Sequence, residues 1–546
     1  MDHDRVNTRW LPHLSSEVVS ETTGNYLDAY VVALEGWRRG LTVKWHVKES
    51  EKFKDIKTWY VDQPGQLFSL HSKDRSHYFF RTRGDKVTNE AVEKGMDKEI
   101  TKQMLERADI PVPRGRQFTK KDSKQKILQF ASSIGFPVVI KPTDGSFGRG
   151  VFSDITTEEG ILHALDYLWN ELGEKSIIVE KHISGNDYRL YVVGDQVVGA
   201  ILRIPPNIIG DGVNTIETLI ESKNEERKFN PRLSNCPIKM DQETIDYMKH
   251  SGNTLSAIPK KGQIIYANNK GNVSIGGDPI DVLDELSENI KKTAVKALQS
   301  IPGLPHGAVD LIVDKDGNGT ETGYVIELNP TAQIGGILFP FKGQARDVPK
   351  AIIDFYFPET KASQRIDAYF DIEKALLPLK KNAAVETEVP ILTREDFHSR
   401  KYNIKGAIDD LQFHQYLRQE AINRDLMGSL KQSETDKWNM VIAGSREKME
   451  EYKNAILDDD SRIIQITENK NHPMVKNGFE IDGAEKNLLN EIRDLNKKRM
   501  QLKHRQTRLE KEYNKMLNST SWRITSPIRK ITGLIKTTYR KFFKKD

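Results

Sequence analysis

The stretch that most constrains the fold is FPVVIKPTDGSFGRGVFS, residues 136–153. A β-branched, apolar run ends in Lys141, and a loop with three glycines follows. Glycines permit positive φ and let backbone N–H groups approach phosphate oxygens without a Cβ in the way. A lysine on the adjoining strand adds a point charge for the same phosphates. The pattern predicts a phosphate-binding loop, with an ordinary hairpin turn as the alternative. The GxxxxGK[ST] loop is excluded, because Lys141 precedes the glycines.

Two acidic residues downstream bracket an apolar, strand-ending segment. In IIVEKHISGNDYRLYVVG, Glu180 precedes the segment and Asp187 follows it. Adenine needs an acceptor for its exocyclic amine and an apolar slot, and a ribose needs a carboxylate for its hydroxyls. We therefore expect Glu180 to face an adenine and Asp187 to face a ribose.

A third group of polar residues lies on two predicted strands, GAVDLIVD and VIELNP. Glu327 and Asn329 are two residues apart on a strand, so they point to the same face, and a paired strand would place Asp310 beside them. Two carboxylates and an amide oxygen are hard ligands that suit Mg²⁺. The alternative for Glu327 and Asn329 is a plain strand end at an Asn-Pro turn.

Together these motifs resemble the ATP-grasp superfamily over roughly residues 93–358, because they occur in the family's order and spacing. The closest likeness is to cyanophycin synthetase and to the ATP-grasp half of bifunctional glutathione synthetases, and D-alanine–D-alanine ligase is more distant. Ala308 stands where D-alanine ligases place an arginine, which argues against that branch. The quoted stretches that carry the likeness are DKEITKQMLERADIPVP, VVIKPTDGSFGRG, VEKHISGNDYRL, VVGAILRIPPNIIGDGVNTIETLI, VDLIVD and VIELNP.

The resemblance implies a complete site for ATP and for Mg²⁺ or Mn²⁺. The implied metal ligands are Asp310, Glu327 and Asn329, and Lys181 and Ile183 are expected to act through their backbone. The implied nucleotide-binding residues are Lys98, Lys141, Ser146, Gly148, Gly150, Glu180, Lys181, Ile183 and Asp187. The implied catalytic residues are Lys141 and Arg203 around the phosphates and Arg189 nearer the acceptor substrate. The alternative for Arg203 is a surface strand residue.

The chemistry implied by the resemblance is carboxylate activation. ATP phosphorylates a carboxylate to an acyl phosphate, and an amine displaces the phosphate to form an amide, so catalysis is mostly positioning and charge stabilisation. The expected partners are a small-molecule or polymer-borne carboxylate and an amine such as an amino acid. The resemblance thus implies an ATP-dependent carboxylate–amine ligase. With the C-terminal helix and tail of the chain, we expect it to serve cell-surface polymer or peptide biosynthesis.

The length of 546 residues predicts several domains in an α+β multidomain protein. We expect an N-terminal α/β pre-ATP-grasp domain at 1–92, an ATP-grasp domain at 93–360, a linker at 361–390 and another α+β unit at 391–482. The last of these resembles an acylphosphatase sandwich. Where that family's phosphate loop reads roughly VQGVGFR, this chain has Ile408 to His414 with two aspartates, Asp409 and Asp410, and Gln432 replaces the family's asparagine. Like charges disfavour a docked phosphate, so we expect no phosphatase activity.

The C-terminal region divides into a helix and a basic tail. Residues 484–517 are predicted to be helical, with apolar residues every seven positions from Leu488 to Met516, which indicates a coiled coil and a homodimer through 488–516. The alternative is one long helix packed on its own protein. Residues 518–546 are basic and aromatic, and the part 522–545 suits an anionic membrane surface; a disordered tail is the alternative.

Composition limits where the protein works. A single cysteine, Cys236, excludes an internal disulfide, and the N-terminus shows no apolar core of a signal peptide, so we expect a cytoplasmic protein, peripheral on the inner face of the membrane. The net charge of +5 is too weak to argue for nucleic acid. Two rival functions stay open at this point: an acylphosphatase-type hydrolase, and a non-catalytic ATP-binding scaffold of a polysaccharide assembly complex.

Overall fold

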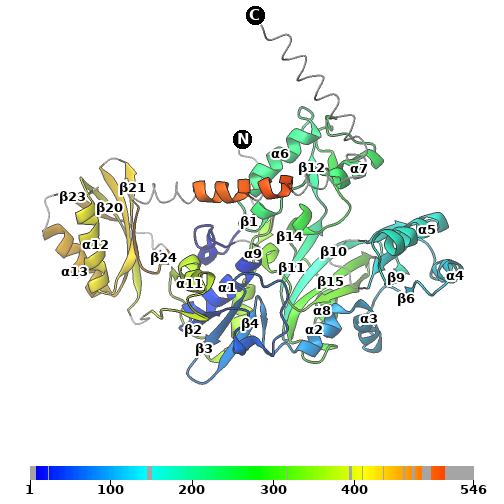
Figure 1. Cartoon of the computed structure of the whole chain (residues 1–546), viewed down its shortest axis with the longest axis horizontal. Coiled ribbons are helices and arrows are strands. Elements are labelled where there is room, and N and C mark those ends of the chain that lie inside the picture. Colours follow the sequence, from blue (N-terminus) through cyan, green and yellow to red (C-terminus); the bar gives the residue numbers. More distant parts are fainter. Residues whose placement is uncertain are drawn as a thin grey trace, which may run out of the picture. The chain divides into compact units, whose positions relative to one another are not determined.

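A computed structural model places the chain in two compact units (Figure 1). The first unit comprises the described residues up to Ser399 with two short later segments within 443–446 and 472–477, and the second comprises the rest. The residues that the structure describes are 8–22, 24–143, 150–315, 318–392, 396–408, 410–434, 436–458, 462–469, 474–482, 494–503 and 505–510.

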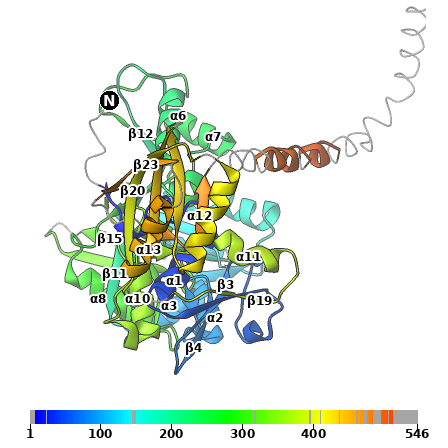
Figure 2. The same cartoon turned by 90° about the vertical axis from the view of Figure 1, so that its left-hand side faces the viewer.

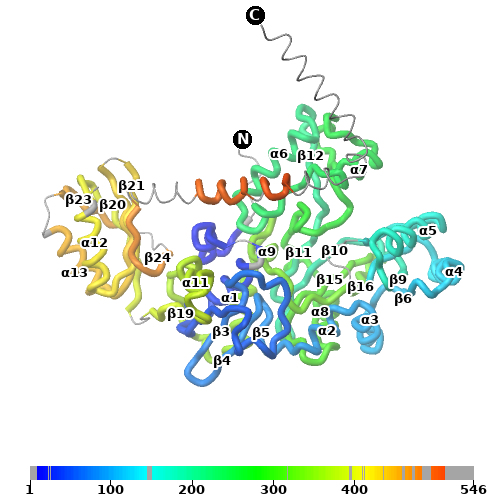
Figure 3. The backbone as a smooth tube through the Cα atoms, in the orientation of Figure 1, coloured from blue at the N-terminus to red at the C-terminus, as the bar shows by residue number. Residues whose placement is uncertain are grey.

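The N-terminal part of the first unit is an antiparallel sheet with helix α1 (Asn25–Arg38) packed on one face (Figure 3). The strands, in spatial order, are β19 (Glu386–Val389), β2 (Thr42–His46), β3 (Leu67–His71), β4 (Ser76–Phe80) and β5 (Arg83–Gly84). Strand alternation directs Val43, Trp45, Phe68 and Leu70 to the helix-covered face, where all four are buried. The predicted α/β character of this region is thus present.

The stretch 361–390 is folded rather than a bare linker, which differs from the expectation. It contains α11 (Ile372–Lys380), and β19 pairs with β2 to extend the N-terminal sheet. Strand β19 is an edge strand whose Glu386 and Glu388 face Lys44, while Val389 is buried. Its charged composition therefore reflects one solvated face of an edge strand, which is why the sequence pattern resembled a linker.

Two further sheets build the middle of the first unit. The smaller one has the order β6 (Gly115–Thr119), β9 (Ser176–Lys181), β7 (Val138–Pro142) and β8 (Phe152–Ile155), and it packs against α4 (Lys124–Ile134) and α5 (Glu158–Asp166). The larger one has the order β14 (Asp278–Asp281), β11 (Gln196–Ile204), β10 (Asn186–Val193), β15 (His306–Lys315) and β16 (Glu321–Asn329). All neighbouring strands in both sheets are antiparallel.

Helices cover one face of the larger sheet, whereas α9 (Gly335–Leu338) and α10 (Val348–Tyr356) cover only part of the other face, which also carries polar side chains. The helices α2 (Asn89–Met96), α3 (Lys98–Arg107) and α8 (Glu288–Gln299) contact β15 or β16. They enclose a core in which Ala294 and Leu298 of α8 meet Val309 and Leu311 of β15. The predicted pairing of the two polar strands is confirmed, since Asp310 lies directly opposite Glu327.

An insertion between β11 and β14 forms a small subdomain with its own core. It contains β12 (Asn207–Ile209), α6 (Ile216–Arg227), α7 (Gln242–His250) and β13 (Ile264–Tyr266). Buried Asp278 anchors it, accepting hydrogen bonds from Arg227 Nη1 and Lys223 Nζ at 2.6 Å each. After β16 the chain continues through α9 and α10.

The second unit is one sheet with two helices on a single face (Figure 2). The strand order is β23 (Ile463–Asn469), β20 (His398–Gly406), β22 (Lys437–Gly444), β21 (Met427–Glu434) and β25 (Phe479–Asp482), and the helices are α12 (Leu411–Asn423) and α13 (Arg446–Asp458). Tyr402, Ile404, Trp438 and Met440 alternate with exposed or half-buried neighbours, so only one face is buried. This is the α+β sandwich that the sequence predicts.

The described part of the C-terminal region, 494–503 and 505–510, is helical. Leu495, Leu502 and Leu509 are exposed by 57%, 64% and 55%, so these residues do not pack on the described parts of this chain. A coiled coil is therefore not shown in the described region, and the tail 518–546 lies outside it. Among the described residues, none of the helices combines the length and apolar character needed to span a membrane.

Close packing at Gly428 generates a stability prediction. A Cβ at Gly428 would overlap the carbonyl oxygen of Val441 on the neighbouring strand, whereas a Cβ at Gly478 (φ +95°) would meet nothing within 4 Å. We expect Gly428→Ala to lower the free energy of unfolding of the second unit by about 2 kcal/mol or more. Gly478→Ala, the control, should lose about 1 kcal/mol for backbone conformation alone. Urea titration would measure both, and equal losses would contradict the packing argument.

Candidate active site

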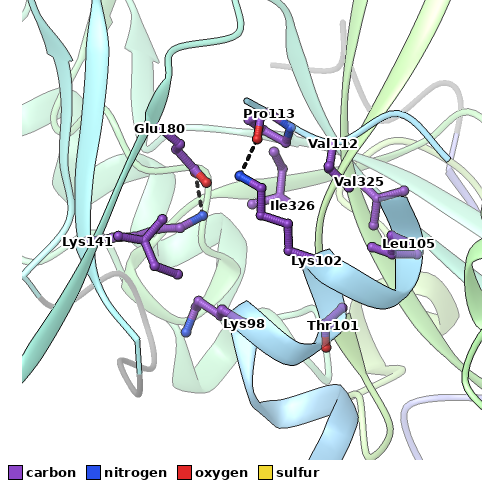
Figure 4. Close-up of a pocket in the computed structure, with 11 residues that line it drawn as sticks. Lys98, Thr101, Lys102, Leu105, Val112, Pro113, Lys141, Glu180, Val325 and Ile326 are labelled. Atoms are coloured by element: carbon purple, nitrogen blue, oxygen red, sulfur yellow. Dashed lines mark hydrogen bonds and ion pairs between the residues drawn. The ribbon is translucent and has the colours of Figure 1, made fainter. Parts of the chain in front are cut away.

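A pocket lies where α3 meets the smaller sheet and the end of β16 (Figure 4). It has an apolar wall and three lysines and one glutamate at its edge. Its lining residues are Lys98, Thr101, Lys102, Leu105, Val112, Pro113, Lys141, Ile178, Glu180, Val325 and Ile326. Segments from position 98 to position 326 thus converge on one slot, and three of the predicted nucleotide residues, Lys98, Lys141 and Glu180, line it.

Helix α3 presents its side chains to this pocket because of where the helix begins. Asp97 caps the N-terminus, accepting hydrogen bonds from the backbone N–H groups of Glu99 and Ile100 at 2.9 Å. Lys98, Lys102 and Leu105 then follow at helical spacing and share one face. The cap therefore sets which residues of this helix line the slot.

Lys141 and Glu180 form a buried ion pair across two neighbouring strands. Lys141 lies opposite Ile178 in the register of β7 and β9, so Glu180 is its diagonal neighbour on the same face. The Nζ of Lys141 lies 2.5 Å from Oε1 of Glu180, and each side chain is 7% exposed. The residue expected to bind phosphates and the one expected to accept from adenine therefore neutralise each other here.

Lys102 is a pocket residue that sequence reasoning missed. Its side chain is buried, and its Nζ donates a hydrogen bond to the carbonyl oxygen of Pro113, as Figure 4 shows. Burial lowers the pKa of Lys102, and the nearby charge of Glu180 opposes that shift. The available signal was its position four residues after Lys98 on the same helix face.

A row of charged residues crosses the larger sheet from strand to strand. Arg189, Asp310 and Glu327 lie side by side on β10, β15 and β16. Arg189 donates to both oxygens of Asp310, with Nε–Oδ1 at 2.7 Å and Nη2–Oδ2 at 2.8 Å. Arg203 bridges two acids, with Nη1 3.0 Å from Asp310 Oδ2 and Nη2 2.6 Å from Asp187 Oδ1.

The electrostatics of this row favour a permanently ionised aspartate. Burial alone would raise the pKa of Asp310, but the guanidinium groups of Arg189 and Arg203 hold it well below its ordinary value. Burial would lower the pKa of Arg203, yet Asp310 and Asp187 raise it. The side chain of Arg203 is 11% exposed, so the alternative of a surface strand residue is wrong.

The end of this row has the donor set of a hard-metal site. Asn329 Nδ2 donates to Glu327 Oε1 at 3.1 Å. Burial raises the pKa of Glu327, and the charge of Asp310 raises it further, so a divalent cation would offset the repulsion between these carboxylates. Within the described residues, no group of three or more His, Cys, Asp and Glu side chains surrounds one point. The oxygens of Asp310, Glu327 and Asn329 therefore fit Mg²⁺ only if nucleotide oxygens complete the shell.

The remaining predicted residues have mixed outcomes. Ser146 and Gly148 lie outside the described residues. Gly150 has φ +70°, and a Cβ there would lie 2.9 Å from Leu168, so this end of the glycine loop requires glycine. The backbone N–H of Lys181 already donates to the carbonyl oxygen of Arg114 at 2.7 Å, which leaves its carbonyl for a backbone contact with a base. Ile183 is half-buried after β9.

The loop before α12 in the second unit carries an acid where an anion would dock. Oδ1 of Asp410 accepts a hydrogen bond from the backbone N–H of Phe413 at 2.8 Å and caps the helix. His414 stands at the position of the arginine in the acylphosphatase phosphate loop. Its ring packs edge-on against that of Trp438, with 5.5 Å between the ring centroids. Asp409 lies outside the described residues. The aspartate cap therefore occupies a backbone donor at the N-terminus of this helix, where an anion would otherwise bind.

The place of Lys102 generates a binding prediction. In Lys102→Met the Pro113 carbonyl loses a charged donor and Glu180 loses a neighbouring cation, so we expect ATP affinity to fall about tenfold, which corresponds to about 1.4 kcal/mol. Lys94→Met, a half-buried lysine on α2 that does not line the pocket, serves as the control. Calorimetric titration with a non-hydrolysable ATP analogue and Mg²⁺ would measure it, and an unchanged dissociation constant for Lys102→Met would remove Lys102 from the site.

The chain is similar to known proteins in two separate regions. Residues 95–210 match the family model of the RimK-like ATP-grasp domain, and residues 400–481 match that of acylphosphatase. The glutathione biosynthesis bifunctional protein GshAB of Clostridium perfringens is 32% identical over 267 residues, which cover 48% of this chain and 34% of that protein. The cyanophycin synthetase of Synechocystis sp. is 32% identical over 279 residues, covering 50% and 31% respectively.

The likeness to these curated relatives is partial, since the chain spans about a third of their length. Among solved structures, the bifunctional glutathione synthetase from Pasteurella multocida is 27% identical with a TM-score of 0.42, and the match covers 54% of this chain and 41% of that one. The chain therefore carries a RimK-like ATP-grasp domain, related to the corresponding parts of cyanophycin synthetases and GshAB proteins, together with an acylphosphatase domain.

Proposed function

We propose that the protein is an ATP- and Mg²⁺-dependent ligase that joins a carboxylate to an amine through an acyl phosphate. One observation carries the proposal: the nucleotide pocket and the row of Arg189, Asp310 and Glu327 both end on β16. ATP with its adenine in this pocket would thus extend its phosphates toward the cations and the metal-ligating oxygens of that row. The half-buried end of that row, at Glu327 and Asn329, is the place for phosphoryl transfer.

The residues present suit each part of this reaction. Lys98 and Lys141 supply positive charge for the triphosphate, and Arg203 and Arg189 supply it for the acyl phosphate. The substrate carboxylate oxygen bonds to the γ-phosphorus as ADP leaves. The amine nitrogen then bonds to the acyl carbon, the C–O bond to phosphate breaks, and the nitrogen loses a proton. Mg²⁺ held at Asp310, Glu327 and Asn329 would neutralise charge on the phosphate oxygens.

We further propose an acceptor amine from an amino acid and a carboxylate that is either a small molecule or borne on a polymer. Ala308, buried opposite Asn329, leaves no arginine at that position, which supports a use other than joining D-alanines. The basic sequence 522–545 supports a cytoplasmic location at an anionic membrane surface, where cell-surface polymers are assembled. An assay of ADP formation against amino acids and uronic-acid polymers would identify the pair.

The acylphosphatase domain is proposed to be a structural or binding module, because Asp410 caps the helix where phosphate would dock. The two rival functions are separated by measurement. A hydrolase would release phosphate from an acyl phosphate without ATP, and a scaffold would bind ATP without amine-dependent ADP release. Either result would replace the ligase proposal.

The metal row generates the first functional prediction. Glu327→Gln keeps the side-chain shape but removes one charge beside Asp310, so we expect amine-dependent ADP formation to fall at least about 100-fold while the fold stays intact. Glu321→Gln lies on the same strand, away from the site, and serves as the matched control. Coupled ADP assays over a range of Mg²⁺ concentrations would measure both, and unchanged turnover in Glu327→Gln would remove the metal assignment.

The exposed leucines generate a second prediction, about assembly. We propose that 488–516 pairs with a second copy, because Leu495, Leu502 and Leu509 repeat every seven residues and remain exposed. Leu502→Lys is expected to convert a dimer into a monomer, whereas the exposed Gln501→Lys on the same helix should not. Light scattering after size-exclusion chromatography would measure the mass, and a wild-type monomer would refute the pairing.

A further inference from the structure

Three buried charged side chains from separate parts of the first unit gather beside the loop that follows β16. Asp28 lies on α1, Arg81 lies in the turn between β4 and β5, and Arg232 follows α6 in the insertion. Their exposed fractions are 2%, 7% and 9%. Charged groups this deeply buried are normally paired or bind a ligand.

Each of the three elements that carry these residues makes a hydrogen bond to the loop that follows β16, the strand of Glu327 and Asn329. Asp28 Oδ1 accepts from the backbone N–H of Ile334 at 3.0 Å, and Arg232 Nη2 donates to Gln333 Oε1 at 2.7 Å. Thr82, next to Arg81, donates its hydroxyl to the carbonyl oxygen of Ala332 at 3.1 Å. Ala332, Gln333 and Ile334 follow Asn329 by three to five residues. The cluster therefore borders the proposed reaction centre.

The larger sheet confirms how close the cluster lies to that centre. Tyr191 is two residues from Arg189 on β10, so both side chains point to the same face about 7 Å apart. Burial raises the pKa of the Tyr191 phenol, the side chain of Thr82 lowers it and the charge of Asp28 raises it further, so Tyr191 lies near both residues. One same-face step along β10 thus separates the Arg189–Asp310 pair from the cluster.

The cluster keeps polar atoms without partners. Asp28 Oδ2 and Arg81 Nη2 are buried and make no hydrogen bond. Asp28 forms no ion pair with Arg81 or Arg232 among the interactions of the described residues, although their charges act on it. Burial raises the pKa of Asp28 to about 6, against the lowering effect of Arg232 and Arg81. An unsatisfied buried polar atom costs about 1–3 kcal/mol, so two in one place call for a function.

The backbone conformation of Arg81 also indicates a functional role for its side chain. Arg81 has φ +59°, a left-handed conformation that costs a non-glycine residue about 1–2 kcal/mol. Its Nε donates to Gln66 Oε1 at 2.7 Å, which leaves Nη2 directed elsewhere. A turn that only needed this conformation would be more stable with glycine. Strain of this kind persists where it aims a functional side chain.

We propose that Asp28, Arg81 and Arg232 form the subsite for an α-amino acid substrate, with its carboxylate at the two arginines and its ammonium at Asp28. The planar donor fork of arginine matches a carboxylate, and a carboxylate is the natural acceptor for an ammonium group. A simple acid would leave Asp28 without a cationic partner, and a simple amine would bring no anionic partner for the two arginines. The assignment rests on the proposed ligase function and specifies the amine substrate.

The test measures amino-acid binding to the full chain in the presence of Mg²⁺ and a non-hydrolysable ATP analogue. Each of the standard L-amino acids is titrated calorimetrically, and every binder is compared with its decarboxylated amine and with its acid lacking the amino group. We expect at least one amino acid to bind, and both of its truncated analogues to bind at least about tenfold more weakly.

Two variants and one matched control locate the site. Asp28→Asn should lower the affinity for the amino acid at least tenfold but leave the affinity for the acid lacking the amino group unchanged. Arg81→Gly removes the guanidinium while suiting the positive φ, so it should stay folded and lose the preference for the amino acid over its decarboxylated amine. Glu35→Gln, a buried carboxylate on the same helix that is paired with Arg39 and Arg365, should bind like the wild type.

The outcomes distinguish this inference from the ligase proposal. Wild-type affinity for the amino acid in Arg81→Gly overturns the subsite, whether or not Asp28→Asn folds. Failure of every amino acid to bind a wild-type protein that takes up the ATP analogue also overturns it and leaves the nucleotide site standing. Failure of the ATP analogue to bind overturns the proposed function itself.

Discussion

The buried carboxylate of Asp310 is the charge around which the site is organised. Its burial is tolerated because Arg189 donates hydrogen bonds to both of its oxygens and Arg203 forms a further ion pair with it. The antiparallel register of β10, β15 and β16 places the partners in one row, so the sheet itself provides the alignment. Removing one partner from such a network leaves a buried charge uncompensated, which ties the stability of the sheet to its chemistry.

The nucleotide pocket depends on a second balance of charge. Lys141 and Glu180 neutralise each other on the smaller sheet, and Lys102 brings a further cation from α3. On the proposed function, a triphosphate would draw Lys141 away, and the nearby charge of Lys102 would still compensate Glu180. That role would account for a lysine buried at a position where it makes one hydrogen bond to the backbone.

The second unit combines the acylphosphatase fold with an altered loop, and we propose that it does not hydrolyse acyl phosphates. Its sheet and two helices retain the acylphosphatase architecture, and the buried face is intact. The loop before α12 instead closes on Asp410, which uses the helix N-terminus as its own cap. A helix end satisfied by an internal carboxylate has little left to offer an external anion.

Sequence alone determined the parts of this protein that depend on local patterns. The strand that ends at Lys141 and Pro142, the helix from Lys98 and the polar pair Glu327 and Asn329 each belong to one continuous segment, so their geometry follows from strand and helix periodicity. Their order along the chain also carried the family likeness, which the matches at 95–210 and 400–481 bear out.

Only the tertiary structure decided the features that join distant segments. Strand β19 completes the N-terminal sheet although its sequence is charged, because an edge strand needs only one buried residue such as Val389. Asp28, Arg81 and Arg232 share no motif, since each is set by a different helix, turn or insertion. Pairing and burial at such sequence separations arise from the packing of the whole unit, and no local pattern encodes them.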